Sequence, residues 1–418
     1  SGFLAQVGAE EAMAADQVVW SEQGRLHVSA SGSIANGTDL AADKITVATG
    51  HGIRVNDTVV LNQAAGTLKC LVTEVGDDYY KAFPYTQATM DATGGTTITF
   101  TASAVTGFVF GSEYKKGTSY DNKGLEPSFA SLTNKPAIIK DLYEVSGSDA
   151  SAIGWIEVSG EEGQNGYLWY LKGNGDTMAR FTDYCEMTCI EGELTASGAG
   201  TTTDLGAISG TEGLFAAVKA RGTVADAGFD SASESLATMD TLLKRFDTQG
   251  AIEENMMFLN RETSLAIDDM LASLNGSAQG NGTNANNVGT SFGLFDNSAD
   301  MALNLGFTGF RRGSYDFYKS DWKYLNDATL RGSFDDITGV IAPAGASNVY
   351  DQIMGKNMKR PFLHVRYRAS QTENRKMKTW ITGSVGAATS NLDAMEVNYL
   401  SERCLVTQGA NNFVLMTK

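Results

Sequence analysis

Residues 110–193 constrain the fold more than any other part of the chain, because they predict a projecting hairpin followed by one very long helix. Residues 108–111 and 138–145 are extended arms, and the polar segment 112–118 lies between them as a tip. After Gly166, apolar residues recur in three- and four-residue steps, the period of a helix with one buried stripe: Leu168, Leu171, Met178, Phe181, Cys185 and Cys189. Such a helix over residues 167–193 would be about 40 Å long. A hairpin and a helix of this kind predict contacts with neighbouring subunits.

Composition narrows the class of protein. The 418 residues are enough for two or three globular units, and 42% apolar with 19% charged residues is typical of a soluble protein. The net charge of −17 argues against direct binding of nucleic acid or anionic lipid other than by a local basic patch. The densest patch, residues 356–368 with Arg375, Lys376 and Lys378, is interpreted as the charged face of a half-exposed sheet.

Targeting and redox signals are weak. No run approaches the roughly 20 apolar residues of a membrane span, and residues 1–20 lack the basic start and apolar core of a signal peptide. Four cysteines do not make a disulfide framework. We therefore expect a soluble protein made inside a cell, with reduced thiols and no contact with a membrane.

The first hundred residues predict two different kinds of structure, a short helix and a β-rich domain. Residues 9–20 form a short helix in an N-terminal arm, with Met13, Val18 and Val19 as its few apolar anchors. Residues 30–105 are rich in Gly and Thr and hold five or six short alternating runs, among them residues 97–101. These runs predict a small β-barrel or sandwich.

Beyond a flexible link at 195–203, the pattern predicts two helices packed on a sheet. Ser231 and Glu234 form a capping box for a helix ending at Gly250, residues 256–259 form a buried strand, and Asn260 caps a second helix ending at Gly276. We expect the C-terminal strands at 380–382, 395–400 and 404–406 to return and close that sheet.

Residues that could carry chemistry do not form a strong constellation. His27, His51 and His364 have no partners at metal-ligand spacing, so we expect no metal and no cofactor. Cys185 and Cys189 share a helix face and could bind a metal or sense an oxidant, but a buried stripe of small residues explains them better. Residues 289–293 match the G-x-S-x-G letters of a hydrolase elbow around Ser291, without the strand and helix that this motif needs. We expect no enzyme.

The order of these parts resembles the tailed-bacteriophage major capsid proteins of the HK97 fold, an α+β class. The resemblance implies seven segments, numbered as follows: N-terminal arm 1–29, inserted β-domain 30–105, extended loop 106–160, spine helix and link 161–200, first part of a peripheral domain 201–280, axial domain 281–345, and return strands of the peripheral domain 346–418. It covers most of the chain except the inserted domain.

The resemblance implies a structural role in the virion. The chain would assemble with itself through hexamers and pentamers into an icosahedral shell around DNA that it touches only indirectly. Its further partners would be portal, scaffold, head protease and decoration proteins. Two alternatives stay open: an encapsulin-like bacterial nanocompartment, which would hold a cargo enzyme, and a β-rich binding or attachment protein led by residues 30–105.

Two sets of residues are predicted to matter for assembly. The contact set is Tyr114, Lys115, Lys116, Tyr167, Trp169 and Phe181. Lys115 and Lys116 either reach an acidic surface on an adjacent subunit or form an ordinary solvated tip. Gly173 and Gly175 each cost about 1 kcal/mol in a helix interior, so they mark either a hinge in the spine helix or a helix that starts only after Gly175.

Overall fold

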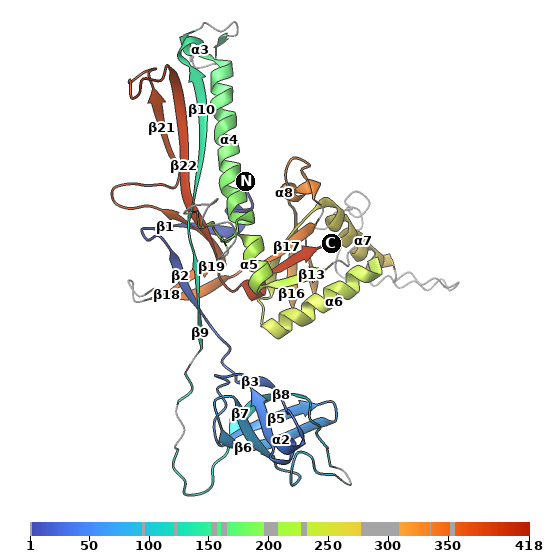
Figure 1. The fold of residues 1–418 in the computed structure, drawn as a ribbon. Helices are drawn as coiled ribbons and strands as arrows, with labels where there is room; N and C mark the ends of the chain where they lie inside the picture. The colour runs from blue at the N-terminus through green and yellow to red at the C-terminus, as the bar shows by residue number, and fades with distance from the viewer. Residues whose placement is uncertain are drawn as a thin grey trace, which may run out of the picture. The chain divides into compact units, whose positions relative to one another are not determined.

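The computed structural model describes residues 2–93, 97–120, 124–126, 128–151, 157–159, 165–195, 208–226, 232–276, 309–334, 336–351 and 356–418. The fold is mixed α+β and divides into two compact units (Figure 1). We call Ser21–Ser131 the barrel unit and the remainder, Ser1–Trp20 with Leu132–Lys418, the main unit. Each unit buries an apolar core of its own.

The barrel unit contains a closed barrel of six strands in the order β3-β4-β7-β6-β5-β8. Its core includes the fully buried side chains of Ile45, Leu61, Tyr80 and Phe100. A small barrel was expected here, but residues 97–101 are not one of its strands. The elements are β3 (Ser29–Ser33), α2 (Gly37–Ala41), β4 (Lys44–Val47), β5 (Asp57–Gln63), β6 (Gly66–Val75), β7 (Tyr79–Pro84) and β8 (Ala104–Ser112).

The hairpin predicted from residues 108–111 and 138–145 is wrong. Phe108 and Gly111 lie in β8 and pair with Val60 and Thr58 of β5, so the barrel extends beyond residue 105. Strand β10 (Ala137–Ser146) instead pairs along its whole length with β22 (Ala394–Thr407). Alternation of apolar and polar residues identifies a strand but not its partner, and here each partner is distant in sequence.

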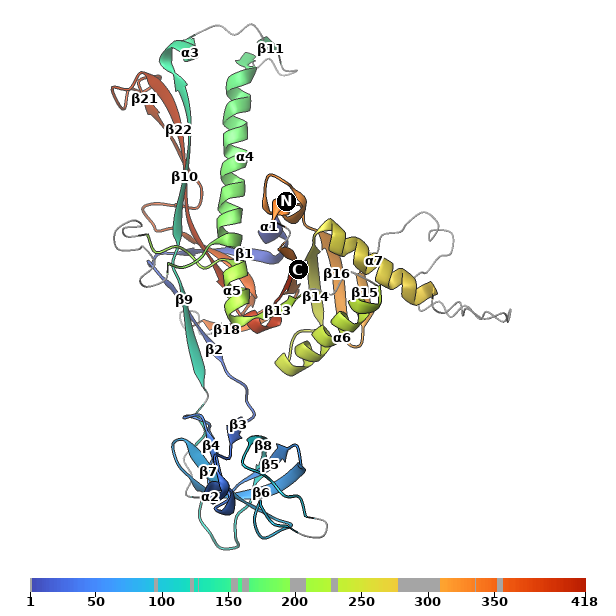
Figure 2. The same ribbon diagram turned by 45° about the vertical axis from the view of Figure 1, so that its right-hand side comes forward.

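The long strands of the main unit form one five-stranded sheet, the long sheet, with the order β1-β20-β22-β10 and with β21 also paired to β22. The helix α4 (Leu168–Glu191) lies along β10 and β22 (Figure 2). Phe181 and Cys185 of α4 pack against Val397 and Tyr399 of β22. The other strands of this sheet are β1 (Gly8–Met13), β20 (Leu363–Arg368) and β21 (Lys378–Gly383).

The helix predicted at residues 9–20 is also wrong. A short helix α1 (Phe3–Val7) precedes β1, which runs parallel to β20. Strand β2 (Val18–Gln23) follows and pairs with β9 (Phe129–Asn134), so both chain crossings between the two units lie in this ribbon. Two of the three predicted apolar anchors of the arm, Met13 and Val18, are buried with Cys404 and Val406, whereas the third, Val19, is exposed.

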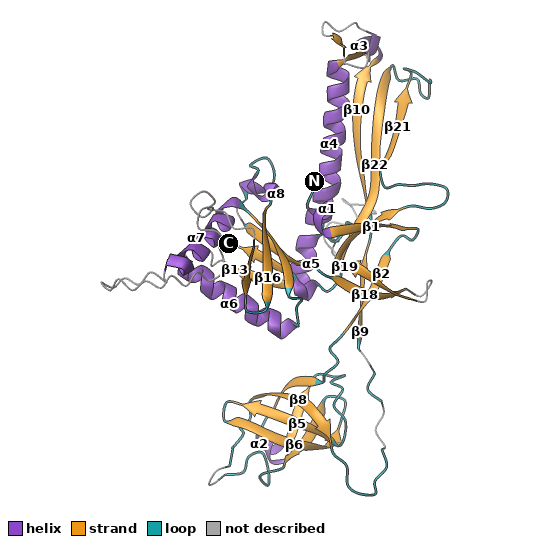
Figure 3. Ribbon diagram, turned by 180° about the vertical axis from the view of Figure 1, so that it is seen from behind, coloured by secondary structure: helices purple, strands orange, loops and turns teal. Residues whose placement is uncertain are grey.

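A second sheet of six strands, the helix-covered sheet, has the order β13-β23-β17-β14-β16-β15. Helices α6 (Ala232–Gln249) and α7 (Arg261–Gly276) cover one face, and α5 (Leu214–Arg221) packs on the other (Figure 3). The predicted cap is confirmed, because Asn260 Oδ1 accepts a hydrogen bond from the Thr263 N–H at 2.8 Å. The strands are β13 (Thr223–Asp226), β14 (Glu254–Leu259), β15 (Gly309–Arg312), β16 (Tyr315–Asp321), β17 (Ile337–Pro343) and β23 (Val414–Thr417).

This sheet corrects the predicted division at residues 280 and 281. Strands from both sides of that boundary, β14 and β16, are hydrogen-bonded neighbours. The segments 380–382 and 395–406 do not close the sheet either, because they belong to the long sheet; β23 occupies the expected place. Short elements complete the fold: α3 (Gly147–Ser151), β11 (Glu157–Ser159), β12 (Asn165–Tyr167), α8 (Lys323–Asn326), β18 (Ala346–Asp351) and β19 (Lys356–Pro361).

A buried carboxylate, Asp43, binds the backbone of Met90 inside the barrel unit. Asp43 is fully buried with a left-handed φ of 51°, and its Oδ1 accepts a hydrogen bond from the Met90 N–H at 2.6 Å. Its Oδ2 meets no hydrogen-bond donor among the described residues. Burial raises the pKa of this carboxyl, the Met90 hydrogen bond opposes that rise, and Asp91 adds to it.

We predict that Asp43→Asn stabilises the barrel unit at pH 8 by about 1 kcal/mol, because Asn keeps the Met90 acceptor and tolerates the left-handed backbone while removing a buried charge. The native pKa lies above the ordinary 3.8, so the native Asp stabilises most at low pH and loses that stability as the pH rises. The advantage of Asn should therefore shrink towards pH 4. Calorimetry of the full chain across this range measures it, and an equal gain at pH 4 and pH 8 would contradict the assignment.

Candidate assembly surfaces

The predicted contact residues Tyr114, Lys115 and Lys116 lie in the loop that leaves β8, in the barrel unit. The Thr118 hydroxyl donates to the Lys115 carbonyl at 2.7 Å, which closes a tight turn through Gly117 with a φ of 78°. Both lysines are exposed and form no ion pair with another described residue. They are therefore free to meet an external anion, although not at the tip of the predicted hairpin.

The other three predicted contact residues lie in or beside the helix α4. Phe181 is fully buried, and its ring centroid lies 5.7 Å from that of Tyr399 in the same chain. The prediction that Phe181 contacts another subunit is therefore wrong for this conformation. Tyr167 ends β12 and Trp169 lies in the first turn of α4, but their side chains are outside the described part of the structure.

Gly173 and Gly175 both lie inside the continuous helix α4, so the helix does not start after Gly175. A Cβ on Gly173 would lie 2.6 Å from Tyr143 Oη, which shows that this glycine lets the helix approach β10 closely. Nothing lies within 4 Å of a Cβ on Gly175. The sequence did not reveal this close packing at Gly173, because a glycine inside a helical pattern is equally compatible with a hinge.

The remaining chemical candidates are structural where the structure describes them. Cys185 and Cys189 are buried, and burial raises the pKa of the Cys189 thiol to about 12. The interpretation of these cysteines as a buried stripe is confirmed. Nowhere in the described ranges do three His, Cys, Asp or Glu side chains come together as a metal site would require. Ser291 and its G-x-S-x-G letters lie outside the described residues.

Carboxylates neutralise the basic patch of the long sheet. Arg366 pairs with Glu11 at 3.2 Å, Arg375 with Glu402 at 2.6 Å, and the ammonium of Lys376 with Glu10. Arg368 and Lys378 have acidic partners as well. The interpretation as the charged face of a half-exposed sheet is confirmed for Arg366 and Arg368 of β20 and Lys378 of β21, whereas Arg375 and Lys376 lie in the connection between these strands. The paired charges leave little for phosphate.

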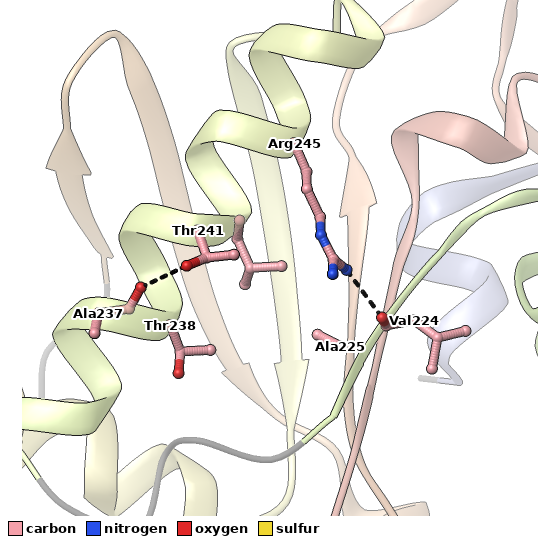
Figure 4. A pocket seen from close by; sticks show the side chains of 7 residues that line it. Val224, Ala225, Ala237, Thr238, Thr241 and Arg245 are labelled. Carbon is pink, nitrogen blue, oxygen red and sulfur yellow. Dashed lines mark hydrogen bonds between the residues drawn. The ribbon is translucent and has the colours of Figure 1, made fainter. Parts of the chain in front are cut away.

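A small hollow of about 310 Å³ lies between α6 and the edge strand β13 (Figure 4). Arg245 of α6 reaches across it and donates to the Val224 carbonyl at 3.0 Å. The other lining residues are Ala225, Ala237, Thr238, Thr241 and Leu242. This lining holds no carboxylate, His or Cys that could act with Arg245, so the contact closes the edge of the sheet rather than building a reaction centre.

On the side away from α4, the long sheet also exposes large apolar side chains, which are interspersed with the charged Lys140 and Glu144. Ile138 and Leu142 alternate with buried or half-buried residues along β10. Asn398 of β22 is paired with Leu142 on one side and with Trp380 of β21 on the other, so the three residues lie side by side across the sheet. The side chains of Ile138, Leu142 and Trp380 are all exposed. Sequence reasoning missed them as a set, because Trp380 becomes a neighbour of Leu142 only through the pairing of β10, β22 and β21.

No sequence-family model and no curated protein matches the chain. Among solved structures, the chain is similar to the capsid of Cyanophage P-SCSP1u, with 8% identity, a TM-score of 0.40, and 73% of this chain and 79% of that chain covered. It is similar to the mature capsid of bacteriophage PhiM1, with 9% identity, a TM-score of 0.38, and 73% and 77% covered. It is also similar to the capsid of the native GTA particle, with 8% identity, a TM-score of 0.40, and 99% and 89% covered.

TM-scores of 0.38 to 0.40 do not establish a shared fold. Of the helices that the structure describes, none has both the length and the apolar character to cross a bilayer.

We predict that Phe181→Ala destabilises the main unit by about 3–5 kcal/mol, because it opens a cavity under α4. Met178→Ala, on an exposed position of the same helix, should change the stability by less than about 0.5 kcal/mol. Chemical denaturation followed by circular dichroism compares the two variants. Equal effects would show that α4 does not pack on the long sheet as described.

Proposed function

We propose that this chain is a shell-forming structural protein, the major capsid protein of a tailed bacteriophage with an HK97-type organisation. The observation that carries the proposal is the long sheet with α4 packed along one face and exposed Ile138, Leu142 and Trp380 on the other. A sheet face that keeps large apolar side chains in water is typical of a surface that another molecule covers.

The strand pairing supports the following assignment of elements within this proposal. The β2–β9 ribbon is the base of the extended loop, and the barrel unit is an insertion within that loop, because both of its chain connections pass through the ribbon. Helix α4 is the spine helix. In this proposal the copies form hexamers and pentamers, the shell is the capsid of a virion, and portal, scaffold, head protease and decoration proteins are its partners.

The charge fits an indirect relation to DNA. The net charge is −17, and the basic side chains of the long sheet from Arg366 to Lys378 are paired with carboxylates. A chain with this net charge repels phosphate, which would leave a packaged genome free to slide. An encapsulin-like compartment would use the same shell architecture but enclose protein.

The direct test is size-exclusion chromatography of the full chain followed by negative-stain electron microscopy, with the contents of any particle identified. We expect closed shells or rings of subunits, and DNA rather than a cargo enzyme in particles taken from their natural source. A monomer under every salt and scaffold condition would contradict the proposal and favour a β-rich binding protein.

The same assay tests Lys115 and Lys116. We propose that they contact an acidic surface of another copy, so Lys115→Glu with Lys116→Glu should reduce assembly about tenfold and weaken its dependence on salt. Lys81→Glu is the matched control, because Lys81 already pairs with Glu74 inside the barrel unit. Unchanged assembly and salt dependence in the double variant would remove these two lysines from the interface.

The hinge at Gly173 and Gly175 is a further part of the proposal. We expect α4 to be bent around these residues in a compact precursor shell and straighter in an expanded one. Gly175→Ala should stabilise the helix by about 1 kcal/mol and slow the change, whereas Met178→Ala, at another exposed position of α4, should do neither, because Met and Ala have similar helix propensities. Electron cryomicroscopy of both shells measures the curvature, and a straight helix through Gly173 in both would exclude a hinge.

A further inference from the structure

The outer surface of the barrel carries four large aromatic side chains at two ends of a four-strand stretch, on or just after β7 and on β8. Phe108 and Phe110 of β8 are each 51% exposed, Phe83 of β7 is 42% exposed, and Tyr85, just after β7, is 48% exposed. The strands follow one another in the order β7-β6-β5-β8, and β5, β6 and β8 lie side by side in Figure 3. We call these four residues the aromatic face.

The strand register shows that this face is continuous. Phe83 is paired with Leu71, and Phe108 is paired with Val60, which is in turn paired with Lys69. Directly opposed residues of antiparallel strands share a face, so these partly exposed apolar side chains bridge the aromatic ones. The alternate residues of the same strands, such as Leu61 and Cys70, fill the barrel core.

A hydrogen bond holds one edge of the face in place. The Tyr85 hydroxyl donates to Glu113 Oε2 at 2.5 Å, which ties the end of β7 to the end of β8. Burial, together with this hydrogen bond to Glu113, raises the pKa of Tyr85 to about 12, so the hydroxyl remains a donor at neutral pH. The loop with Lys115 and Lys116 begins immediately beyond Glu113.

The charges around the face indicate what covers it. Lys69 lies on the face, Lys115 and Lys116 lie beyond its edge, and none of the three has an acidic partner among the described residues. The barrel unit holds 8 Lys and Arg against 11 Asp and Glu, so it accounts for −3 of the net charge of −17 and the main unit for the other −14. With three lysines and one edge carboxylate, Glu113, the apolar face carries a net positive charge that is complementary to that acidic unit.

The alternative occupant, a carbohydrate, fits less well. Sugar hydroxyls need hydrogen-bonding groups beside the aromatic ring, whereas three of the four aromatic side chains are Phe and the Tyr85 hydroxyl is already engaged. We propose that the aromatic face is a docking surface for the acidic main unit of a second copy of this chain. This inference rests on the proposed shell function and names the contact that the inserted barrel would make within it.

The test uses the full chain in the assembly assay. Phe108→Ser with Phe110→Ser should leave the thermal unfolding of the barrel unchanged, because both side chains point away from its core, and should reduce the fraction of assembled chain at least tenfold. Phe83→Ser, at the other end of the face, should act in the same direction. Phe334→Ser is the matched control, since Phe334 is a 70% exposed phenylalanine in the main unit.

A photo-crosslinking phenylalanine analogue at position 108 identifies the partner. Crosslinks from residue 108 to acidic segments of the main unit, formed between two copies, would support the inference. Normal assembly of the folded variants would overturn it, as would binding of a glycan by the wild type that the variants lose. If the wild type itself never assembles, the shell function fails first, and the absence of any crosslink between copies then rejects the docking surface as well.

Discussion

The packing of α4 on the long sheet is the interaction on which the rest of the main unit depends. Phe181 and Cys185 fill the surface offered by Val397 and Tyr399, Gly173 brings the helix close to Tyr143, and Arg180 pairs with Asp141 of β10 at 3.0 Å. Helix α4 thereby buries the apolar residues on one face of the sheet within the same chain. The arm residues Met13 and Trp20 cover Cys404 and Val406 on the opposite face. Farther along that face, Ile138, Leu142 and Trp380 remain exposed and are available to a partner.

Local patterns predicted much of the helix-covered sheet and the existence of the barrel. The capping residue Asn260, the strand at 256–259 and the helices on either side of it are set by contacts within a few residues, which a sequence displays directly. Strand partners are different, because β10 pairs with β22 across some 250 residues and β1 pairs with β20 across an even longer separation. The hairpin and the arm helix were wrong for this reason: their local patterns were compatible with strands or helices whose partners lie elsewhere.

For the candidate sites too, the sequence predicted local features but not the contacts made by residues far apart in the chain. The apolar stripe of α4 was visible in the sequence, but a stripe does not say whether it is buried within one chain or between two, and Phe181 turned out to be buried within the chain. The aromatic face of the barrel was not predicted at all. Phe83 and Phe108 come onto one outer face only after β7, β6, β5 and β8 have paired in order, so no local spacing could have joined them.

The central claim is that copies of this chain form a shell. In this shell α4 packs on the long sheet of its own chain, and the aromatic face of the barrel contacts the main unit of another copy. Electron cryomicroscopy of assembled particles at side-chain resolution tests this most directly. The predicted map shows α4 packed through Phe181 on Tyr399 of the same chain, with Phe108 and Phe110 covered by the main unit of a neighbour. A map in which the aromatic face points into solvent, or in which no ordered shell of identical subunits exists, would contradict it.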